Sequence, residues 1–300
     1  MTNREHWEEL FANWSKGPQK TETDRIENTK RVISEAIKND ENLNSRNIKI
    51  FVQGSYKNSV NVRKDSDIDI GVLCSDTFYY VFNDEDIKEY QKEFISPATY
   101  SYYQFKNDVE TALVKRFGRE NVKRGKKAFN IKSSSTRVDA DVSAFFEHRR
   151  YYAKDKYHQG VEMISDDNQE IVNWPEQHYE NGVAKNDETL RRYKRTVRIF
   201  KKLNNVMEEN KIISENKISS FFIECLIWNV PNKYFNYDNH YDRVKEVIRY
   251  LYHQTKNDNN LNEWGEVSEL KYVFRGVNRS VTDANDFVLK AWNYVGFSDD

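Results

Sequence analysis

The segment from residue 47 to residue 74 restricts the fold more than any other part of this 300-residue chain. Apolar residues alternate with polar ones at 48, 50 and 52, and again at 68, 70 and 72. This period of two is typical of β-strands, whose successive side chains point to opposite faces. A Gly-Ser pair at 54–55 ends the first run, and Asp-Ile-Asp at 67–69 opens the second. We therefore predict two strands in the front half of the chain, at 47–52 and 67–74, with acids at the start of the second.

The two aspartates of the second strand are expected to project from one face, because side chains two residues apart in a strand lie on the same side. Ionised carboxylates about 7 Å apart repel each other unless a cation lies between them. Such oxygen ligands suit Mg²⁺, and two Mg²⁺ ions can activate a hydroxyl and stabilise leaving pyrophosphate. A third acid is offered by Asp139 or Asp141, which share one face of a predicted strand at 136–146. The alternative is that Asp67 and Asp69 simply face solvent from an edge strand.

The Gly-Ser pair favours the metal-site interpretation, because it lies at the end of the neighbouring strand. Gly54 lets the backbone approach a phosphate closely, and the hydroxyl of Ser55 can donate to it. Taken alone, a Gly-Ser pair indicates only a turn.

The remaining pattern divides the chain into a mixed front half and a helical back half. In the front half, helices are predicted at 22–40 and 101–117, and strands at 127–132, 136–146 and 160–165. In the back half, helices are predicted at 187–208, 216–229, 240–256 and 282–295. We predict a mixed α/β, two-lobed fold, with a β-sheet core lobe at 1–175, a helical lobe at 176–300 and the active site in the cleft. The boundary is soft, near 170–187, and the N-terminal helix could pack across both lobes.

Composition excludes several classes of protein. Lysine plus arginine (47) nearly balances aspartate plus glutamate (48), which argues against a protein that coats nucleic acid by bulk charge. No apolar run approaches the roughly 20 residues that a membrane helix needs, so we expect no membrane association. Cys74 and Cys225 lie in apolar stretches and are expected to be buried thiols in a reducing compartment, the cytoplasm. Six scattered histidines predict no structural zinc site.

A basic helix is predicted at 191–202. Its cations recur at three- and four-residue steps: Arg191, Lys194, Arg195, Arg198, Lys201 and Lys202. Like charges at this spacing disfavour one another. The helix therefore either presents a solvated face or supplies the counter-charge to a triphosphate.

At these residues the sequence resembles the nucleotidyltransferase superfamily, and more narrowly the bacterial CD-NTases. These are cyclic-oligonucleotide synthases related to cyclic GMP–AMP synthase and oligoadenylate synthetase. The Gly-Ser and Asp-x-Asp pair within FVQGSYKNSVNVRKDSDIDIGV specifies only the superfamily. The later segments RVDADVSAFFEHRRYY, WPEQHYENGVAKND, RRYKRTVRIFKKL and KISSFFIECLIWNVP narrow it to the family, and the likeness runs from about residue 22 to the last helix. The chain departs from the pattern at Ser143-Ala144, where many relatives carry Val-Pro.

The resemblance assigns roles to individual residues. Asp67 and Asp69 would hold two Mg²⁺ ions, for which Mn²⁺ can substitute. Asp141, rather than Asp139, would be the third metal ligand and would help to deprotonate the acceptor hydroxyl. The remaining assignments concern the donor nucleotide: Gly54, Ser55, Lys201 and Ser220 would hold its triphosphate, and Phe221 would stack on its base. Core packing is the alternative for Phe221, because stacking and burial look identical in sequence.

The function implied by the resemblance is the condensation of nucleoside triphosphates, as donor and acceptor, into a cyclic di- or oligonucleotide with release of pyrophosphate. Such a product would switch on an effector in bacterial anti-phage defence (CBASS). A linear oligonucleotide synthase or nucleotide-tailing enzyme would use the same aspartates, and a catalytically silent nucleotide- or RNA-binding module is a further alternative. A nucleic-acid activator is not favoured, because the charges balance. The bases, linkages, ring size and oligomeric state stay open.

Overall fold

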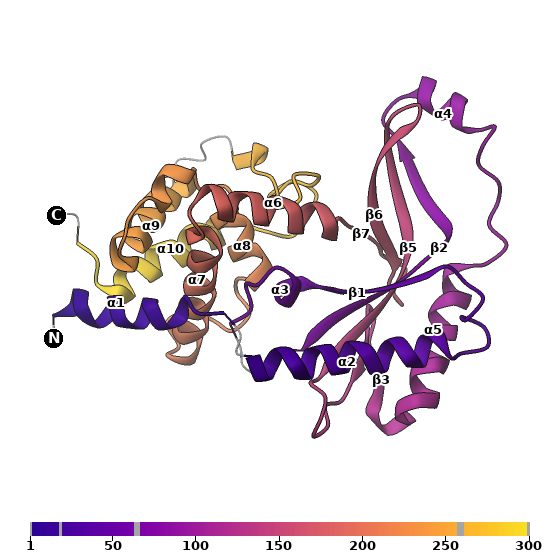
Figure 1. The fold of residues 1–300 in the computed structure, drawn as a ribbon. Coiled ribbons are helices and arrows are strands. Elements are labelled where there is room, and N and C mark those ends of the chain that lie inside the picture. The colour runs from indigo at the N-terminus through magenta and orange to yellow at the C-terminus, as the bar shows by residue number, and fades with distance from the viewer. Residues whose placement is uncertain (1, 18–19, 63–66, 257–260, 299–300) are drawn as a thin grey trace. The chain divides into compact units, whose positions relative to one another are not determined.

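The computed structural model describes residues 2–17, 20–62, 67–256 and 261–298. The chain divides into two compact units, each with a hydrophobic core of its own. The helical unit comprises Met1–Pro18, Asn58–Val62 and Gln177–Asp300, and the sheet unit comprises Gln19–Lys57 and Arg63–Glu176. The elements of both are labelled in Figure 1.

The sheet unit is built on a mixed seven-stranded sheet. Its strands are β1 (Ile48–Gln53), β2 (Ile68–Phe82), β3 (Val122–Arg124), β4 (Phe129–Ile131), β5 (Ala140–Ala153), β6 (Lys156–Ile164) and β7 (Glu170–Asn173). The main order is β1-β2-β5-β4-β3, and β6 pairs with both β5 and β7. Among the strands that the structure describes, β2 and β5 pair in parallel and the other pairs are antiparallel. The predicted mixed α/β fold is therefore confirmed.

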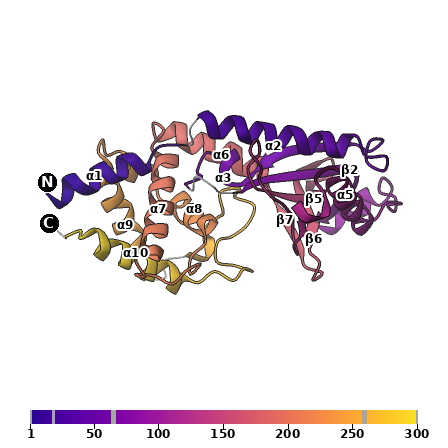
Figure 2. The ribbon, with the colours of Figure 1, turned by 90° about the horizontal axis from the view of Figure 1, so that it is seen from below.

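Helices of the sheet unit pack on this sheet (Figures 1 and 2). They are α2 (Lys20–Lys38), α3 (Gly54–Lys57), α4 (Glu85–Gln91) and α5 (Tyr102–Phe117), with a 3₁₀ turn at Arg119–Asn121. Ile33 and Ile37 of α2 and Phe105 and Val109 of α5 are fully buried among strand residues such as Val72. Their three- and four-residue spacing places these side chains on one face of each helix.

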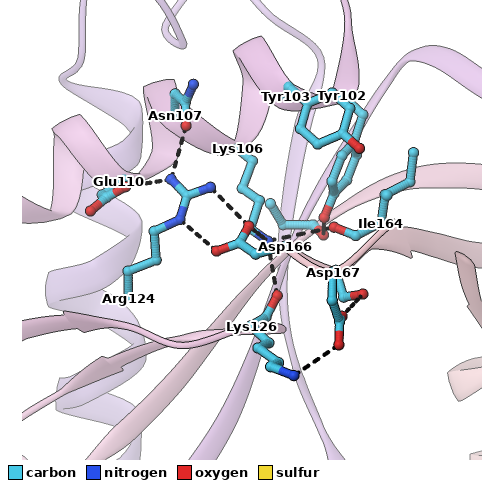
Figure 3. A network of polar contacts seen from close by, with 12 residues as sticks. Tyr102, Tyr103, Lys106, Asn107, Glu110, Arg124, Lys126, Ile164, Asp166 and Asp167 are labelled. Atoms are coloured by element: carbon cyan, nitrogen blue, oxygen red, sulfur yellow. Dashed lines mark hydrogen bonds and ion pairs between the residues drawn. The ribbon is translucent and has the colours of Figure 1, made fainter. Parts of the chain in front are cut away.

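An ion cluster, drawn in Figure 3, fastens α5 to the sheet. Lys106 of α5 is almost completely buried, and its ammonium lies 2.7 Å from Oδ1 of Asp166, in the turn after β6. Arg124 of β3 donates to both oxygens of the same carboxylate, at 2.8 and 2.9 Å, and pairs with Glu110 at 2.6 Å. The Arg124 guanidinium, and then Lys106, hold the pKa of Asp166 well below its usual range. Asp166 is thus the shared anion of two cations.

The helical unit contains α1 (Asn3–Trp14), α6 (Pro175–Glu188), α7 (Arg192–Glu209), α8 (Ser220–Trp228), α9 (His240–Lys256) and α10 (Val281–Val295), with 3₁₀ turns at Asn232–Phe235 and Leu261–Glu263. Two details differ from the sequence-based expectation. The expected joining segment at 170–187 is largely the helix α6, and the helix expected from 187 begins at Arg192. The reason is a break at Leu190 and Arg191, whose φ angles are 53° and 63°. No glycine marks this left-handed pair in the sequence.

The first helix belongs to the core of the helical unit. Trp7 and Phe11 of α1 are buried against α7 and α9. The guanidinium of Arg198 on α7 donates to the backbone carbonyls of Ser15 and Ser59, so it ties three distant segments of the chain together.

The structure also bears on the two cysteines and on helices that could span a membrane. Cys74 and Cys225 are both buried and unpaired, as expected. No membrane-spanning helix is found in the described part of the chain.

Candidate active site

The candidate metal-binding aspartates lie on the paired strands β2 and β5. Asp69 stands directly beside Asp141 in the parallel register, and Asp67 immediately precedes β2. Asp67 is exposed, whereas Asp69 and Asp141 are half-buried. The structure therefore brings Asp69 and Asp141 to neighbouring positions of one sheet, with Asp67 two residues away along the chain.

The two candidates for the third acid have different partners. Oδ1 of Asp139 accepts a hydrogen bond from the backbone N–H of Ser133 at 2.7 Å, which fixes the preceding loop. Oδ1 of Asp141 accepts instead from the side-chain amide of Asn130 on β4, at 3.2 Å. This geometry favours Asp141, since it lies on the strand beside Asp69 while Asp139 has a local structural role. Asn130 was not anticipated from the sequence, because a lone asparagine in a short strand carries no signal.

The carboxylates perturb one another. Burial, followed by the neighbouring carboxylates of Asp141 and Asp67, raises the pKa of Asp69 to about 6. Burial and then Asp141 and Asp139 also raise the pKa of Asp67. Both shifts mean that the ionised form is disfavoured, since desolvation and like charge act in the same direction. A cation is the natural complement to such a group.

Gly54 directly follows β1 and lies against the carboxylate of Asp69. Its φ is +67°, and an added Cβ would lie only 2.2 Å from Oδ2 of Asp69. Glycine is therefore required twice, for its backbone conformation and for the close approach of the carboxylate. Ser55 follows on the short helix α3 and is half-buried.

Asp67, Asp69 and Asp141 suit Mg²⁺ because they are carboxylates and because they lie on or beside the paired strands β2 and β5. Carboxylate oxygens are the ligands that Mg²⁺ prefers, with water and phosphate completing its shell. Across residues 2–17, 20–62, 67–256 and 261–298, no three His, Cys, Asp or Glu side chains are grouped closely enough to hold a metal ion. A bound ion would therefore require Asp67, Asp69 and Asp141 to turn toward it.

The predicted nucleotide-binding residues of the back half lie in the helical unit. Lys201 is buried on α7, and its Nζ lies 2.7 Å from Oε2 of Glu224 on α8. The other oxygen of Glu224 lies 2.8 Å from Nε2 of His178 on α6. Burial by itself raises the pKa of Glu224, but Lys201 and His178 together lower it to about 2. Lys201 is thus the partner of a buried carboxylate.

Ser220 and Phe221 open the helix α8. The cap of this helix is Ser219, whose hydroxyl accepts from the backbone N–H of Phe222, and Ser220 is exposed beside it. The ring of Phe221 is 37% exposed, so it is not part of the core. It lies 5.9 Å from the ring of His178, nearly parallel to it, and the guanidinium of Arg279 lies 5.1 Å from its centroid. An exposed, supported aromatic ring of this kind can stack on a base.

Sequence reasoning missed Glu224 and His178. Both are single residues in apolar or mixed segments, and their partnership with Lys201 depends on the packing of α6, α7 and α8. The acid in FFIECLIW was the available signal, because an isolated glutamate in an apolar helix needs a buried partner.

Comparison with known proteins identifies the chain. Residues 180–296 match the model of the cGAS/DncV-like nucleotidyltransferase C-terminal helical domain. The chain is 41% identical to the cyclic dipyrimidine nucleotide synthase CdnE of Cecembia lonarensis, over 97% of this chain and 98% of that protein. The chain belongs to the CD-NTase family.

Two further relatives show the range of the family. The cyclic dipurine nucleotide synthase of Elizabethkingia meningoseptica is 37% identical over 97% of this chain and 98% of its own. The solved structure of the CdnE c-UMP-AMP synthase of Rhodothermus marinus, with Apcpp and Upnpp, has a TM-score of 0.85 to this fold. It is 27% identical and covers 98% of each chain. The predicted family is therefore confirmed, and its members of similar identity to this chain are named for different bases.

Proposed function

We propose that this CD-NTase condenses nucleoside triphosphates into a cyclic di- or oligonucleotide and releases pyrophosphate. The observation that carries the proposal is the pairing of Asp69 with Asp141 on β2 and β5, with Asp67 beside them, in a chain 41% identical to a named cyclic nucleotide synthase. A protein that only binds nucleotides has no need of three acids whose charges disfavour one another.

The three aspartates would hold two Mg²⁺ ions, for which Mn²⁺ can substitute. The bound ions would stabilise charge on the phosphates and lower the pKa of the acceptor hydroxyl. Asp141, oriented by Asn130, would accept the proton of that hydroxyl. Gly54 would keep Asp69 close to the backbone of the β1–α3 turn, and Ser55 would donate to the donor triphosphate.

Lys201 and Ser220 would hold the same triphosphate, and Phe221 the base. An ammonium has three donors, and Glu224 takes one of them from Lys201. Glu224 would thus orient Lys201 while leaving donors for phosphate. Ser220 and Phe221 support this assignment by their exposure at the start of α8.

The activity is tested by incubating the protein with all four labelled nucleoside triphosphates and Mg²⁺, and then with phosphatase. A cyclic product has no removable terminal phosphate, so label that resists phosphatase is expected. Label that is fully released would indicate a linear synthase or tailing enzyme. Chelation with EDTA should abolish product, and Mg²⁺ or Mn²⁺ should restore it.

Matched variants sharpen this assay. Asp69→Asn and Asp141→Asn should each reduce product at least about 100-fold, because each removes a metal ligand or base. Asp139→Asn is the control on the same segment and should retain most activity. Asp69→Asn should not lower the melting temperature, since it removes a charge that burial and Asp141 disfavour. Full activity of Asp69→Asn would exclude the proposed metal site.

The bases are to be identified by mass spectrometry of the product. Relatives of similar identity are named for pyrimidine pairs and for purine pairs, so likeness alone does not select a base. Specificity of this kind depends on a few contacts worth only about 1–3 kcal/mol each.

The cellular role proposed is anti-phage signalling from the cytoplasm, where nucleoside triphosphates are made and buried thiols stay reduced. A nucleic-acid activator is not part of the proposal, and the product would act on a separate effector. Plaque counts in cells that carry the native operon, with wild-type protein or Asp69→Asn, test this role. Equal plaque counts would contradict it.

A further inference from the structure

A pocket in the helical unit is lined mainly by cations. Its volume is about 370 Å³, and it is formed by the end of α6, the first turns of α7 and Ser59. The cationic side chains that line it are Arg191, Lys194, Arg195 and Arg198. None of the residues assigned above to metal, triphosphate or base is among its lining residues.

The positive charge of this pocket is not neutralised by ion pairs. In the described residues, none of its four cations forms an ion pair with a carboxylate, whereas the adjacent Arg192 pairs with Asp238 at 2.7 Å. Asp187 is the single acid among the lining residues. The guanidinium of Arg198 donates hydrogen bonds to the backbone carbonyls of Ser15 and Ser59. These carbonyls carry no net charge, so they do not neutralise Arg198. Among the lining residues, four cations therefore face one acid. Burial lowers the pKa of Lys194, an effect that the nearby carboxylates of Glu224 and Asp187 partly offset.

The spacing of the cations concentrates this charge. Lys194 and Arg195 lie four and three residues before Arg198 on α7, so the three share one side of the helix, and Arg191 immediately precedes its first turn. Burial, together with Arg195, lowers the pKa of Arg198 to about 10, which still leaves it charged at neutral pH. The like charges disfavour one another, and a bound anion would offset that cost.

We propose that this pocket binds the phosphate chain of a small polyanion, of the class of inorganic triphosphate or a nucleoside triphosphate. Guanidinium groups match phosphate oxygens in a bidentate geometry, and a volume of about 370 Å³ lies in the range of small-ligand pockets. A concave site in a chain of net charge −1 suits a compact anion better than a long nucleic acid. The proposal does not depend on the function proposed above.

The test uses the full-length protein, EDTA in place of divalent metal, and inorganic triphosphate as the probe. Calorimetry should show binding that Arg195→Ser weakens at least about tenfold, because a charge-assisted contact is lost. Lys202→Ser is the matched control, with the same change of charge on the same helix outside the pocket, and it should bind like wild type. Arg195 is exposed and forms no ion pair with another described residue, so its variant should fold, as circular dichroism would check.

Hydrogen–deuterium exchange locates the bound anion. Triphosphate should protect the backbone amides of residues 186–198 in wild type and in Lys202→Ser, but not in Arg195→Ser. Equal weakening by both substitutions, or protection confined to Gly54–Lys57 and Ser220, would overturn the proposal. So would a lack of binding by triphosphate together with tight, Arg195-dependent binding of single-stranded RNA.

A parallel titration with ATP identifies the source of the phosphate. Arg195-dependent binding of either molecule supports the proposal. Equal affinities assign the site to the phosphate chain alone, and tighter binding of ATP assigns it to a nucleotide.

Discussion

At the scale of single residues, Gly54 and Asp69 lie in close contact within the candidate site. The backbone of Gly54 turns with a positive φ, and the Asp69 carboxylate occupies the space that a side chain at 54 would need. The same carboxylate is raised in pKa by burial and by its acidic neighbours. The absence of a side chain at Gly54 thus leaves the space in which the Asp69 carboxylate lies.

Gly54→Ala should lower both stability and activity. The left-handed backbone costs a residue with a Cβ about 1–2 kcal/mol, and the contact with Asp69 adds to that cost. Displacement of Asp69 should reduce product formation about 100-fold, as small misplacements of catalytic groups do.

The matched control is Gly276→Ala, which has the same φ of +67° but nothing within 4 Å of the added Cβ. It should show only the backbone cost in chemical denaturation and keep its activity. Equal effects of the two substitutions would mean that the contact with Asp69 is unimportant.

Sequence reasoning works at this scale where the signal is local. Gly54, Asp67 and Asp69 follow from a strand period and one turn. The second strand offers Asp139 or Asp141, and it is the family resemblance that selects Asp141. The surroundings of Lys201 could not be predicted, because Glu224 and His178 meet it only after three helices have packed. Neither the charge of a lysine such as Lys201 nor its spacing along the chain shows whether its ammonium is buried against a carboxylate or free to bind phosphate.

At the scale of elements, ion pairs with at least one buried member hold neighbouring segments together. Glu224 joins α8 to α7 through Lys201 and to α6 through His178. Asp166 joins the turn after β6 to α5 and β3 (Figure 3). In both clusters one carboxylate faces two basic side chains, so the carboxylate is the sensitive position.

Glu224→Gln should lower the free energy of unfolding by about 3–5 kcal/mol, because it leaves the buried Lys201 ammonium without a counter-charge. The double variant Lys201→Met with Glu224→Met should recover part of this loss, since it removes both charges. If Lys201 also binds phosphate, the double variant regains stability but not activity. Urea unfolding and the product assay measure the two effects.

The pH dependence of this pair has a definite sign. The pKa of Glu224 is about 2 in the fold against 4.5 as the ordinary value. Its stabilising effect is therefore fully present above pH 4.5 and is lost as pH falls toward 2. The stability difference between wild type and Glu224→Gln should narrow over that range, and a constant difference would contradict the pairing.

Asp166→Asn should lower the free energy of unfolding by about 1–3 kcal/mol, because the buried Lys106 loses an anion that is itself partly exposed to solvent. Asp167→Asn is the matched control one residue away, where the pair with exposed Lys126 should contribute little to stability. Because the pKa of Asp166 is lowered, the loss should fade as pH falls below 3.8. Urea titrations of both variants test the contrast.

Most elements could be predicted, and the exceptions have physical causes. Periodic apolar residues indicated α2, α5, β1 and the helices α7 to α10, whereas α6 lies in the segment that was expected to join the lobes. The break between α6 and α7 was missed because Leu190 and Arg191 adopt a left-handed conformation that their residue types rarely take. β2 extends to Phe82, well beyond the predicted 74, because its second half pairs with β5 after an irregularity at Cys74/Phe78.

At the scale of the whole molecule, chain order and compact units do not coincide. The chain passes from one unit to the other four times, and the helical unit uses both the first residues and the last. Phe11 and Val60 join a core whose other members come mostly from beyond residue 192.

Phe11→Ala should therefore destabilise the helical unit by about 3–5 kcal/mol, as for other large buried side chains. For the same reason, a fragment of residues 177–300 should be less stable than this unit in the full chain. Hydrogen exchange of α7 and α9 in both proteins measures the difference. Unchanged protection of these helices would show that α1 is dispensable.

The place of α1 also has a consequence for synthesis. Trp7 and Phe11 pack against α7 and α9, the first of which begins about 180 residues after α1 ends. At about 5–20 residues per second, roughly 9 to 36 seconds separate the synthesis of α1 from that of α7. Until then the apolar side of α1 lacks its native partners.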